Sequence, residues 1–188
     1  MSIVFIISGP SGSGKSSLVE LLLRLVSGLD FYVSYTTRPR RGSERDGHDY
    51  FFISCEEFER MVAAGEFIEH AKVFGNCYGT ARRFLDQATE HGHDLLLDVD
   101  VQGASQVKEQ TPDTVSIFVL PPAPHELEWR LRSRGLDAEE VIQRRLALAS
   151  HEMENDRRYD YVLVNERLEE CADELRKIVL SERKRRSG

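Results

Sequence analysis

Apolar residues form nearly continuous runs at four places along the chain. A strand with one face in water would alternate apolar and polar residues, so an almost unbroken run predicts a strand buried on both faces. The runs predict strands over residues 3–7, 95–99, 115–120 and 161–164.

Helical spacing of apolar residues is found beside these strands. A helix is predicted over residues 17–26, because Leu18, Leu21, Leu22 and Leu25 would share one of its faces. Further helices are predicted over residues 102–109, 125–134 and 168–183. Since strands and helices alternate, we predict an α/β fold in which helices flank both faces of a largely parallel sheet.

The middle of the chain, residues 34–79, has a different pattern. It contains short alternating pieces, such as residues 50–53, and many turn residues. One helix is well marked: Ser54 and Glu57 form a capping-box pattern, and Gly65 ends it. We predict an insertion in the parallel core here, and a polar helical flap over residues 137–156.

Composition narrows the class of protein. The 188 residues are 40% hydrophobic and 30% charged, which predicts one compact domain, with two independent domains as the less favoured alternative. No apolar run approaches the about 20 residues of a membrane span, and no basic segment precedes Ile3, so a cytoplasmic protein is expected. Three cysteines without paired spacing predict neither a disulfide framework nor a zinc site.

Charge indicates the kind of ligand. The net charge of −7 counts against general binding of nucleic acid or anionic membranes. The arginines are clustered nevertheless, for example at residues 38–41, 130–134 and 144–145. Guanidinium groups match phosphate oxygens bidentately, so small phosphorylated ligands are expected, although many of these arginines are expected to pair with surface glutamates.

A phosphate-binding loop is predicted between the first strand and the first helix. GPSGSGKS, from Gly9 to Ser16, matches the pattern of glycine, four residues, then Gly-Lys-Ser. Backbone N–H groups of such a loop hold an anion, the lysine neutralises the β- and γ-phosphates, and the serine hydroxyl binds Mg²⁺. The predicted ATP-binding residues here are Gly9, Ser11, Gly12, Ser13, Gly14, Lys15, Ser16 and Ser17. A purely structural turn is the alternative.

Three further motifs contain candidate residues. Asp98, at the end of an apolar strand, is expected to orient the water shell of a nucleotide-bound metal ion; the alternative is a satisfied strand-end or capping carboxylate. Residues 34–42 present hydroxyls and guanidinium groups suited to a second phosphate, and residues 75–80 are predicted to form a turn with a phenol and a hydroxyl. Thr80 could instead cap a helix over residues 82–90.

His91 and His93, on either side of Gly92, also invite a metal interpretation. We predict a helix-ending surface turn here instead, since the sequence shows no further ligand nearby.

Taken together, these motifs resemble the guanylate kinases, which are ATP:GMP phosphotransferases. The matching segments, in order, are GPSGSGKSS, VSYTTRPRRG, GHDYFF, FIEHAKVFGNCYGT, LLLDVDVQGA, IFVLPP, RLRSRG and YDYVLVN. The resemblance implies a single P-loop kinase domain. Its parallel-sheet core would comprise residues 1–33, 83–125 and 152–188, with an inserted mixed α/β GMP-binding lobe over 34–82 and a helical lid over 126–151.

The resemblance also implies residue roles. The GMP phosphate would be held by Arg38, Arg41, Tyr50 and Tyr78, and guanine would be read by Ser34, Glu69, Thr80 and Asp100. Guanine carries N1–H and N2–H₂ groups that can both donate to one carboxylate. Adenine would instead place the lone pair of its N1 against that carboxylate. Lid residues Arg130, Arg134 and Arg145 would join Lys15, Arg38 and Arg41 in catalysis, and Asn165 would lie near adenine.

The chain departs from the family pattern at two places. Tyr35 stands where histidine is usual, and Pro39 and Gly42 come one position early. Arg40 or Arg41 could therefore take the second phosphate contact, and we favour Arg41 because its distance from Arg38 is preserved.

The implied reaction transfers phosphoryl from MgATP to GMP or dGMP, in purine nucleotide metabolism. Two alternatives are a kinase of another phosphorylated acceptor, such as a ribosyl bisphosphate, and a non-catalytic module that binds peptides. The carboxylate and hydroxyl set argues against the first, and the intact Lys15 and Ser16 argue against the second. Both a monomer and a homo-oligomer are compatible with the sequence.

Overall fold

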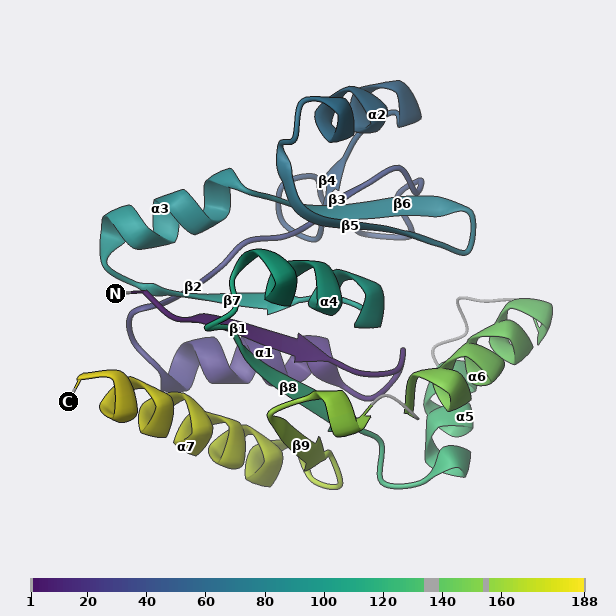
Figure 1. The fold of residues 1–188 in the computed structure, drawn as a ribbon. Helices are drawn as coiled ribbons and strands as arrows, with labels where there is room; N and C mark the ends of the chain where they lie inside the picture. Colours follow the sequence, from purple (N-terminus) through teal and green to yellow (C-terminus); the bar gives the residue numbers. More distant parts are fainter. Residues whose placement is uncertain (1, 134–138, 154–155, 188) are drawn as a thin grey trace. The chain divides into compact units, whose positions relative to one another are not determined.

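The computed structural model describes residues 2–133, 139–153 and 156–187 (Figure 1). The chain divides into two compact units. The first contains residues 2–4 and Gly28–Thr114, and the second contains Phe5–Ser27 and Val115–Gly188. Among the described residues, no helix combines the length and the apolar character that crossing a bilayer requires.

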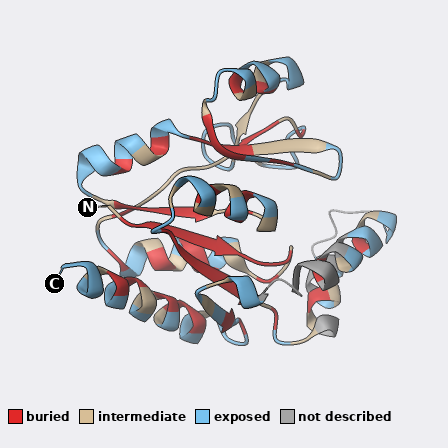
Figure 2. Cartoon of the chain, in the orientation of Figure 1, coloured by how far each residue is buried: buried red, intermediate tan, exposed pale blue. Residues whose placement is uncertain are grey.

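Three parallel strands form the sheet of the second unit. They are β1 (Val4–Ser8), whose first residue belongs to the first unit, β8 (Val115–Leu120) and β9 (Tyr161–Val164). β8 pairs with both of the others, Phe5 opposite Val115 and Ile117 opposite Tyr161. β1 and β8 are buried over almost their whole length (Figure 2). The predicted buried strands are confirmed for β1 and β8. At β9 the strand is confirmed but its burial was wrong, since Val162 and Val164 are 43% and 46% exposed, because β9 is an edge strand.

Two long helices of the second unit pack on each other, α1 (Lys15–Leu25) and α7 (Leu168–Ser187). α1 begins two residues earlier than predicted, at the lysine of the loop. Its buried residues are Leu18, Val19 and Leu22, whereas Leu25 is 47% exposed. The predicted helix is confirmed, but its assigned face was wrong at Leu25 because Val19 and Val26 are buried instead.

A helix pair follows β8 in the second unit. It consists of α5 (Pro124–Ser133) and α6 (Glu139–Met153), and the short helix η1 (Asp156–Arg158) comes next. Leu127, Ile142 and Ala149 form a small apolar cluster of their own. The predicted polar helical stretch is confirmed within the described residues.

The first unit contains a parallel pair and a mixed sheet. The pair is β2 (Leu29–Phe31), which was not predicted, and β7 (Asp94–Asp98). Helix α3 (Arg83–His91) packs on β7, and α4 (Val101–Gln110) follows that strand. The mixed sheet has the order β4-β3-β6-β5, with β4 (Phe51–Phe52), β3 (Tyr35–Thr36), β6 (Asn76–Ala81) and β5 (Phe67–Val73).

β5 and β6 form an antiparallel hairpin, which corrects the turn predicted over residues 75–80. Only Phe74 and Gly75 lie in the turn, with φ angles of 49° and 83°. Thr80 is therefore a strand residue, and the alternative that it caps a helix is wrong, because α3 is capped at Arg82. Strand pairing across the sheet determines the conformation of this segment. Its six residues, two of which are glycines, carry no clear local signal for a strand.

The predicted capped helix is confirmed as α2 (Cys55–Ala63). Ser54 Oγ accepts a hydrogen bond from the N–H of Glu57 at 3.1 Å, and Gly65 adopts a φ of 68° just after the helix. α2 packs on β5 through a core of mostly aromatic residues. This core consists of Tyr35, Phe58, Met61, Phe67, Ala81 and Phe84. Tyr35, which departs from the family pattern, is thus a core residue, and its hydroxyl accepts a hydrogen bond from Arg83.

Candidate active site

The predicted phosphate loop connects β1 to α1 in the second unit. Gly9 has a φ of 140°, and a Cβ atom there would lie 2.2 Å from the carbonyl oxygen of Val119 in β8. Gly12 and Gly14 also have positive φ angles, of 94° and 92°. The glycines therefore allow a close approach of two backbones and a conformation that other residues rarely adopt.

Lys15 folds back over its own loop. Its Nζ donates to the carbonyl oxygens of Gly9 at 2.6 Å and of Pro10 at 3.3 Å. The ammonium group is therefore held above the loop by two neutral acceptors. No carboxylate among the described residues pairs with it, so it can exchange these two acceptors for phosphate oxygens.

The first turn of α1 is suited to an anion. Its N-cap, Gly14, provides no side-chain hydrogen bond, and the first turn, all of it within the described residues, contains no acidic side chain. Ser16 and Ser17 are exposed there. Backbone N–H groups and the positive end of the helix dipole thus have no counter-charge from that turn, as phosphate binding requires.

Asn165 contacts the loop from the end of β9. It is 4% exposed, and its Nδ2 donates to the carbonyl oxygen of Ser13 at 2.8 Å. The hydroxyls of Ser8 and Ser13 are buried without a hydrogen-bond partner among the described residues. The structure thus brings Asn165 to the loop, while its predicted place near adenine stays a prediction.

For two of the three predicted lid arginines the structure describes only the backbone, and the third lies outside the described residues. Arg130 lies on α5 and Arg145 on α6, but their side chains are not among those described, and Arg134 lies outside the described residues. Their roles stay predictions.

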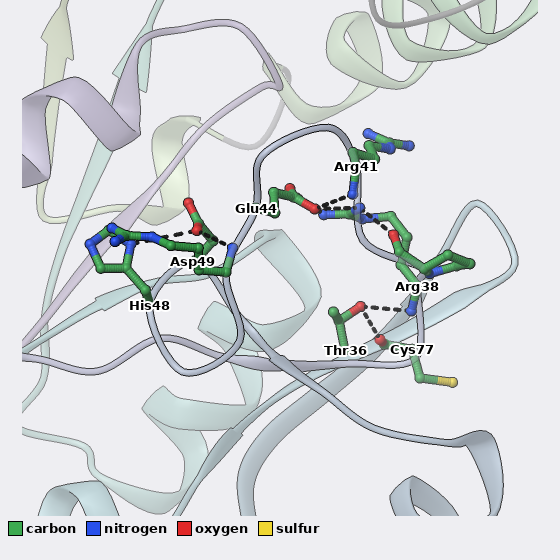
Figure 3. A network of polar contacts seen from close by, with 9 residues as sticks. Thr36, Arg38, Arg41, Glu44, His48, Asp49 and Cys77 are labelled. Atoms are coloured by element: carbon green, nitrogen blue, oxygen red, sulfur yellow. Dashed lines mark hydrogen bonds and ion pairs between the residues drawn. The ribbon is translucent and has the colours of Figure 1, made fainter.

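In the first unit, Arg38 is buried and held by Glu44 (Figure 3). Its Nη1 donates to Glu44 Oε2 at 3.0 Å and to the carbonyl oxygen of Pro39 at 2.7 Å, and its Nη2 donates to Glu44 Oε1 at 2.7 Å. Burial lowers the pKa of Arg38, but the hydrogen bond and charge of Glu44, together with the contact with Tyr78, outweigh it, so the pKa of Arg38 is raised. Arg38 is therefore a fixed cation.

Arg40 and Arg41 have different surroundings. The guanidinium of Arg40 lies 5.3 Å from the ring centre of Phe52, and its Nη2 lies 3.9 Å from Asp46. Arg41 is exposed, and its backbone N–H donates to Glu44 Oε2 at 2.7 Å (Figure 3). One carboxylate thus joins Arg38 to the backbone of Arg41.

The two predicted phosphate-binding tyrosines lie beside Arg38. The rings of Tyr50 and Tyr78 meet edge to face at 6.0 Å, and the Arg38 guanidinium lies 5.4 Å from the ring centre of Tyr50. Burial raises the pKa of Tyr50 to about 12, and the charge of Asp98 adds to the effect. Tyr50 is therefore a proton donor over the physiological pH range.

Asp98 ends β7, as predicted, and it is partly buried. The residue that caps α4 is Asp100, so the alternative in which Asp98 caps the following helix is not what the structure shows.

The structure brings together all four residues predicted to read guanine. Glu69 in β5 pairs in register with Thr80 in β6, and the two side chains are 5% and 2% exposed. The hydroxyls of Thr80 and Ser34 lie 3.3 Å apart, and the hydroxyl of Thr80 bonds to Glu69. Asp100 is close enough for its charge to raise the pKa of Glu69.

Glu69 is positioned by an irregularity in its strand. The register between β5 and β6 shifts between Phe67 and Glu69, so Ile68 is an extra residue. A β-bulge of this kind turns the next side chain relative to the regular strand. Burial raises the pKa of Glu69 to about 7, the hydroxyl of Thr80 opposes that shift, and the charge of Asp100 adds to it.

Helix α4 holds this strand through two glutamines that the sequence predictions missed. Gln106 donates to the carbonyl oxygen of His70 at 2.8 Å and accepts from its N–H at 3.0 Å, and Gln110 donates to the carbonyl oxygen of Ile68 at 2.7 Å. The backbone on both sides of Glu69 is thereby fixed. Their spacing of four residues puts them on one helix face, which is the only local signal.

Glu44 and Gly103 were also missed. Glu44 carries no motif of its own, and its role follows from the bonds to Arg38 and Arg41. Gly103 donates its N–H to Asp100 Oδ1 at 2.8 Å and leaves space for the Glu69 carboxylate.

Comparison with known proteins supports the resemblance inferred from the motifs. A model of the guanylate kinase family matches residues 1–182. The chain is 57% identical over 188 residues to a guanylate kinase of Koribacter versatilis, covering 98% of this chain and 81% of that protein. It is 51% identical over 180 residues to one of Syntrophotalea carbinolica, covering 96% and 86%.

A solved structure agrees with these relatives. The crystal structure of guanylate kinase from Anaplasma phagocytophilum matches with a TM-score of 0.78 at 38% identity, covering 96% of this chain and 86% of that chain. The α/β fold and the resemblance inferred from the motifs are therefore confirmed. This chain belongs to the guanylate kinase family of phosphotransferases.

Proposed function

We propose that this enzyme transfers the γ-phosphoryl group of ATP to GMP, or to dGMP, and releases ADP and GDP. The observation that carries the proposal is the buried carboxylate of Glu69, which lies beside the hydroxyls of Thr80 and Ser34. Within the described part of the chain Glu69 forms a hydrogen bond with the hydroxyl of Thr80 but no ion pair, so a ligand that donates to it would offset the cost of its burial.

Guanine supplies those donors. Its N1–H and N2–H₂ groups would both donate to Glu69, and Asp100, Ser34 and Thr80 would complete the contacts to the base. Adenine would place the N1 lone pair against the carboxylate. Binding of adenine would therefore leave buried polar groups of the site unpaired, and a site rejects such a ligand strongly.

The phosphate of GMP would bind Arg38, Arg41, Tyr50 and Tyr78. Glu44 occupies one edge of the Arg38 guanidinium, so the group is oriented before the substrate arrives. We favour Arg41 as the second phosphate ligand, because its spacing from Arg38 is preserved and Glu44 joins its backbone to Arg38.

ATP would bind the loop of the second unit. The backbone N–H groups of Gly9, Ser11, Gly12, Ser13, Gly14, Ser16 and Ser17 would surround its phosphates. Lys15 would leave the carbonyl oxygens of Gly9 and Pro10 and contact the β- and γ-phosphates. Asn165, which bonds to Ser13, would keep the loop in place next to adenine.

Mg²⁺ fits the donors that the chain offers. The hydroxyl of Ser16 and the carboxylate of Asp98 are hard oxygen ligands, which this ion prefers. We propose that Ser16 binds the ion directly and that Asp98 orients its water shell. Bound Mg²⁺ would neutralise part of the phosphate charge.

In the reaction, a phosphate oxygen of GMP would attack the γ-phosphorus of ATP, and the bond to the β–γ bridging oxygen would break. The attacking oxygen is already anionic, so no general base is needed. Arg130, Arg134 and Arg145 would stabilise the transferring group together with Lys15, Arg38 and Arg41. We assign these three arginines to a lid over residues 126–151, and we assign residues 34–82 to a GMP lobe and the rest of the chain to a core.

The test measures ADP formation from MgATP with GMP, dGMP, AMP, CMP and UMP. We expect turnover with the two guanine nucleotides only. Lys15→Ala should abolish turnover and leave GMP binding intact by calorimetry. Lys177→Ala, which removes an exposed lysine paired with Asp173, is the matched control. Equal turnover with AMP, or full activity of Lys15→Ala, would refute the proposal.

A further inference from the structure

Three potential metal ligands meet at the end of α3, in the first unit. His91 is the last residue of that helix, His93 precedes β7, and Asp30 lies in β2. One donor atom from each lies within 4.8 Å of the other two. The prediction that no further ligand lies near the histidines is therefore wrong, because Asp30 is 61 positions from His91.

Local structure explains how the two histidines face one point. Gly92 ends α3 with a φ of 68°, and the N–H groups of Gly92 and His93 donate to the carbonyl oxygens of Thr89 and Ala88 at 3.0 and 2.9 Å. This helix ending reverses the chain between the histidines. The predicted helix-ending turn is thus confirmed, and it presents both rings to Asp30.

Strand pairing supplies the carboxylate. β2 and β7 are parallel, with Leu29 opposite Asp94 and Asp30 opposite Leu95. Asp30 therefore lies next to the residues that follow α3. Asp30 is thus positioned by strand pairing, and the two histidines are positioned by the end of α3.

The Asp30 carboxylate bridges the two rings. Its Oδ1 lies 2.8 Å from Nδ1 of His93, and its Oδ2 lies 3.0 Å from Nδ1 of His91. The hydroxyl of Tyr32 donates to Oδ2 at 3.3 Å. The side chains of His91 and His93 are 57% and 43% exposed and that of Asp30 is 20% exposed, so an ion can enter from solvent.

We propose that Asp30, His91 and His93 bind a divalent transition-metal ion and that Zn²⁺ is the ion they suit. Two imidazole nitrogens and one carboxylate oxygen are a donor set that Zn²⁺ accepts at about 2.0–2.2 Å, with water completing the tetrahedron. Mg²⁺ prefers oxygen ligands alone, so this site differs in chemistry from that of a nucleotide-bound ion. None of the three residues is assigned to ATP or GMP.

The bound ion would connect the end of α3 to β2. Any ligand that binds only the folded protein raises its stability by mass action. The site is therefore expected to stabilise the first unit against unfolding, independently of the proposed kinase reaction.

The experiment titrates the tag-free full chain with Zn²⁺ against a chromophoric chelator. A Cys55→Ser background removes the exposed thiol, which would compete for the ion. We expect one site, with at least tenfold weaker binding in Asp30→Asn and in His93→Ala. His48→Ala is the control, because His48 is an exposed histidine 3.5 Å from a single carboxylate, Asp49.

Thermal unfolding provides the second readout. Zn²⁺ should raise the midpoint of the parent protein and of His48→Ala, and it should leave those of Asp30→Asn and His93→Ala unchanged. Metal-free unfolding curves show whether each variant is folded. Equal Zn²⁺ affinity in the parent and both site variants, or no Zn²⁺ binding by the folded parent, would overturn the proposal and leave a hydrogen-bonded His-Asp-His cluster only.

Discussion

A Cβ atom on Gly103 would lie 2.4 Å from Oε2 of Glu69 and 3.1 Å from its Cδ. The first turn of α4 therefore packs directly on the carboxylate proposed to read guanine. The same turn contains Asp100, which accepts the N–H of Gly103 at 2.8 Å. Glycine at this position leaves the Glu69 carboxylate in its place, so Gly103 positions the group proposed to recognise the base.

Gly103→Ala should weaken GMP binding by about 1–3 kcal/mol, the usual cost of forcing an extra group into a packed site. The Glu69 carboxylate must turn away from the new methyl group, while ATP binding should stay the same. Calorimetry with each nucleotide measures both effects. Ser105→Ala, an exposed position two residues further along α4, is the control. Unchanged GMP affinity in Gly103→Ala would contradict the positioning role.

Glu69→Gln should weaken GMP by about 1–3 kcal/mol, because the amide can accept only one of the two guanine donors and mispairs the other. Discrimination against AMP should fall together with GMP affinity. Competition between the two nucleotides in the ADP assay measures the change. Glu59→Gln, an exposed carboxylate on α2, should behave like the parent protein. If both variants bind GMP equally well, Glu69 does not read the base.

The stability of the protein should depend on pH through Glu69. Its pKa is raised to about 7 in the folded protein from 4.5, so the folded state holds the proton more tightly. The resulting stabilisation is fully present below about pH 4.5 and is lost as pH rises through about 7, by about 3 kcal/mol in total.

Urea unfolding from pH 4.5 to 8 measures this dependence. Because Glu69→Gln lacks the titrating group, its unfolding free energy should fall less over the same range. Parallel curves for the parent and the variant would show that the Glu69 carboxyl has an ordinary pKa.

Glu44→Gln should destabilise the protein by about 2 kcal/mol, since it leaves the buried Arg38 without its charged partner. The matched control is Glu57→Gln. Glu57 makes the same two-pronged contact with Arg60, but both side chains are about half exposed, so a much smaller loss is expected. Urea unfolding compares the two, and equal losses would mean that burial of Arg38 does not matter.

Gly9→Ala should cost at least about 3 kcal/mol of stability or prevent folding, because the new methyl group meets the Val119 carbonyl and φ is 140°. In any folded fraction, ATP binding should be lost. Gly65→Ala separates the two causes, since φ there is 68° but no atom lies within 4 Å of the added Cβ. A folded Gly9→Ala protein that binds ATP normally would contradict the assigned loop geometry.

Local sequence signals were sufficient to predict the elements that depend on residues close together in the chain. The apolar runs of β1 and β8, the loop from Gly9 to Ser16 and the Ser54 cap of α2 each depend on residues within a few positions of one another. These elements form because of backbone preferences and burial, and both follow from the residue types themselves. The face of α1 was predicted less well, since Val26 is buried whereas Leu25 is 47% exposed.

The hairpin of β5 and β6 shows where local signals end. Residues 75–80 were predicted to form a turn, but pairing with β3 and β5 extends all but the first of them into a strand. Pairing partners contribute the hydrogen bonds that decide between the two conformations, and those partners lie elsewhere in the chain.

The sequence by itself determined the phosphate loop, the alternation of strands and helices, and the family to which the motifs belong. Only the tertiary structure decided how Ser34 reaches Thr80 across 46 positions, how α4 packs on Glu69, and how Asp30 meets His91 and His93. The reason is physical: each of these contacts depends on the register of paired strands and the packing of a helix on them, which bring together residues that have no influence on one another along the chain.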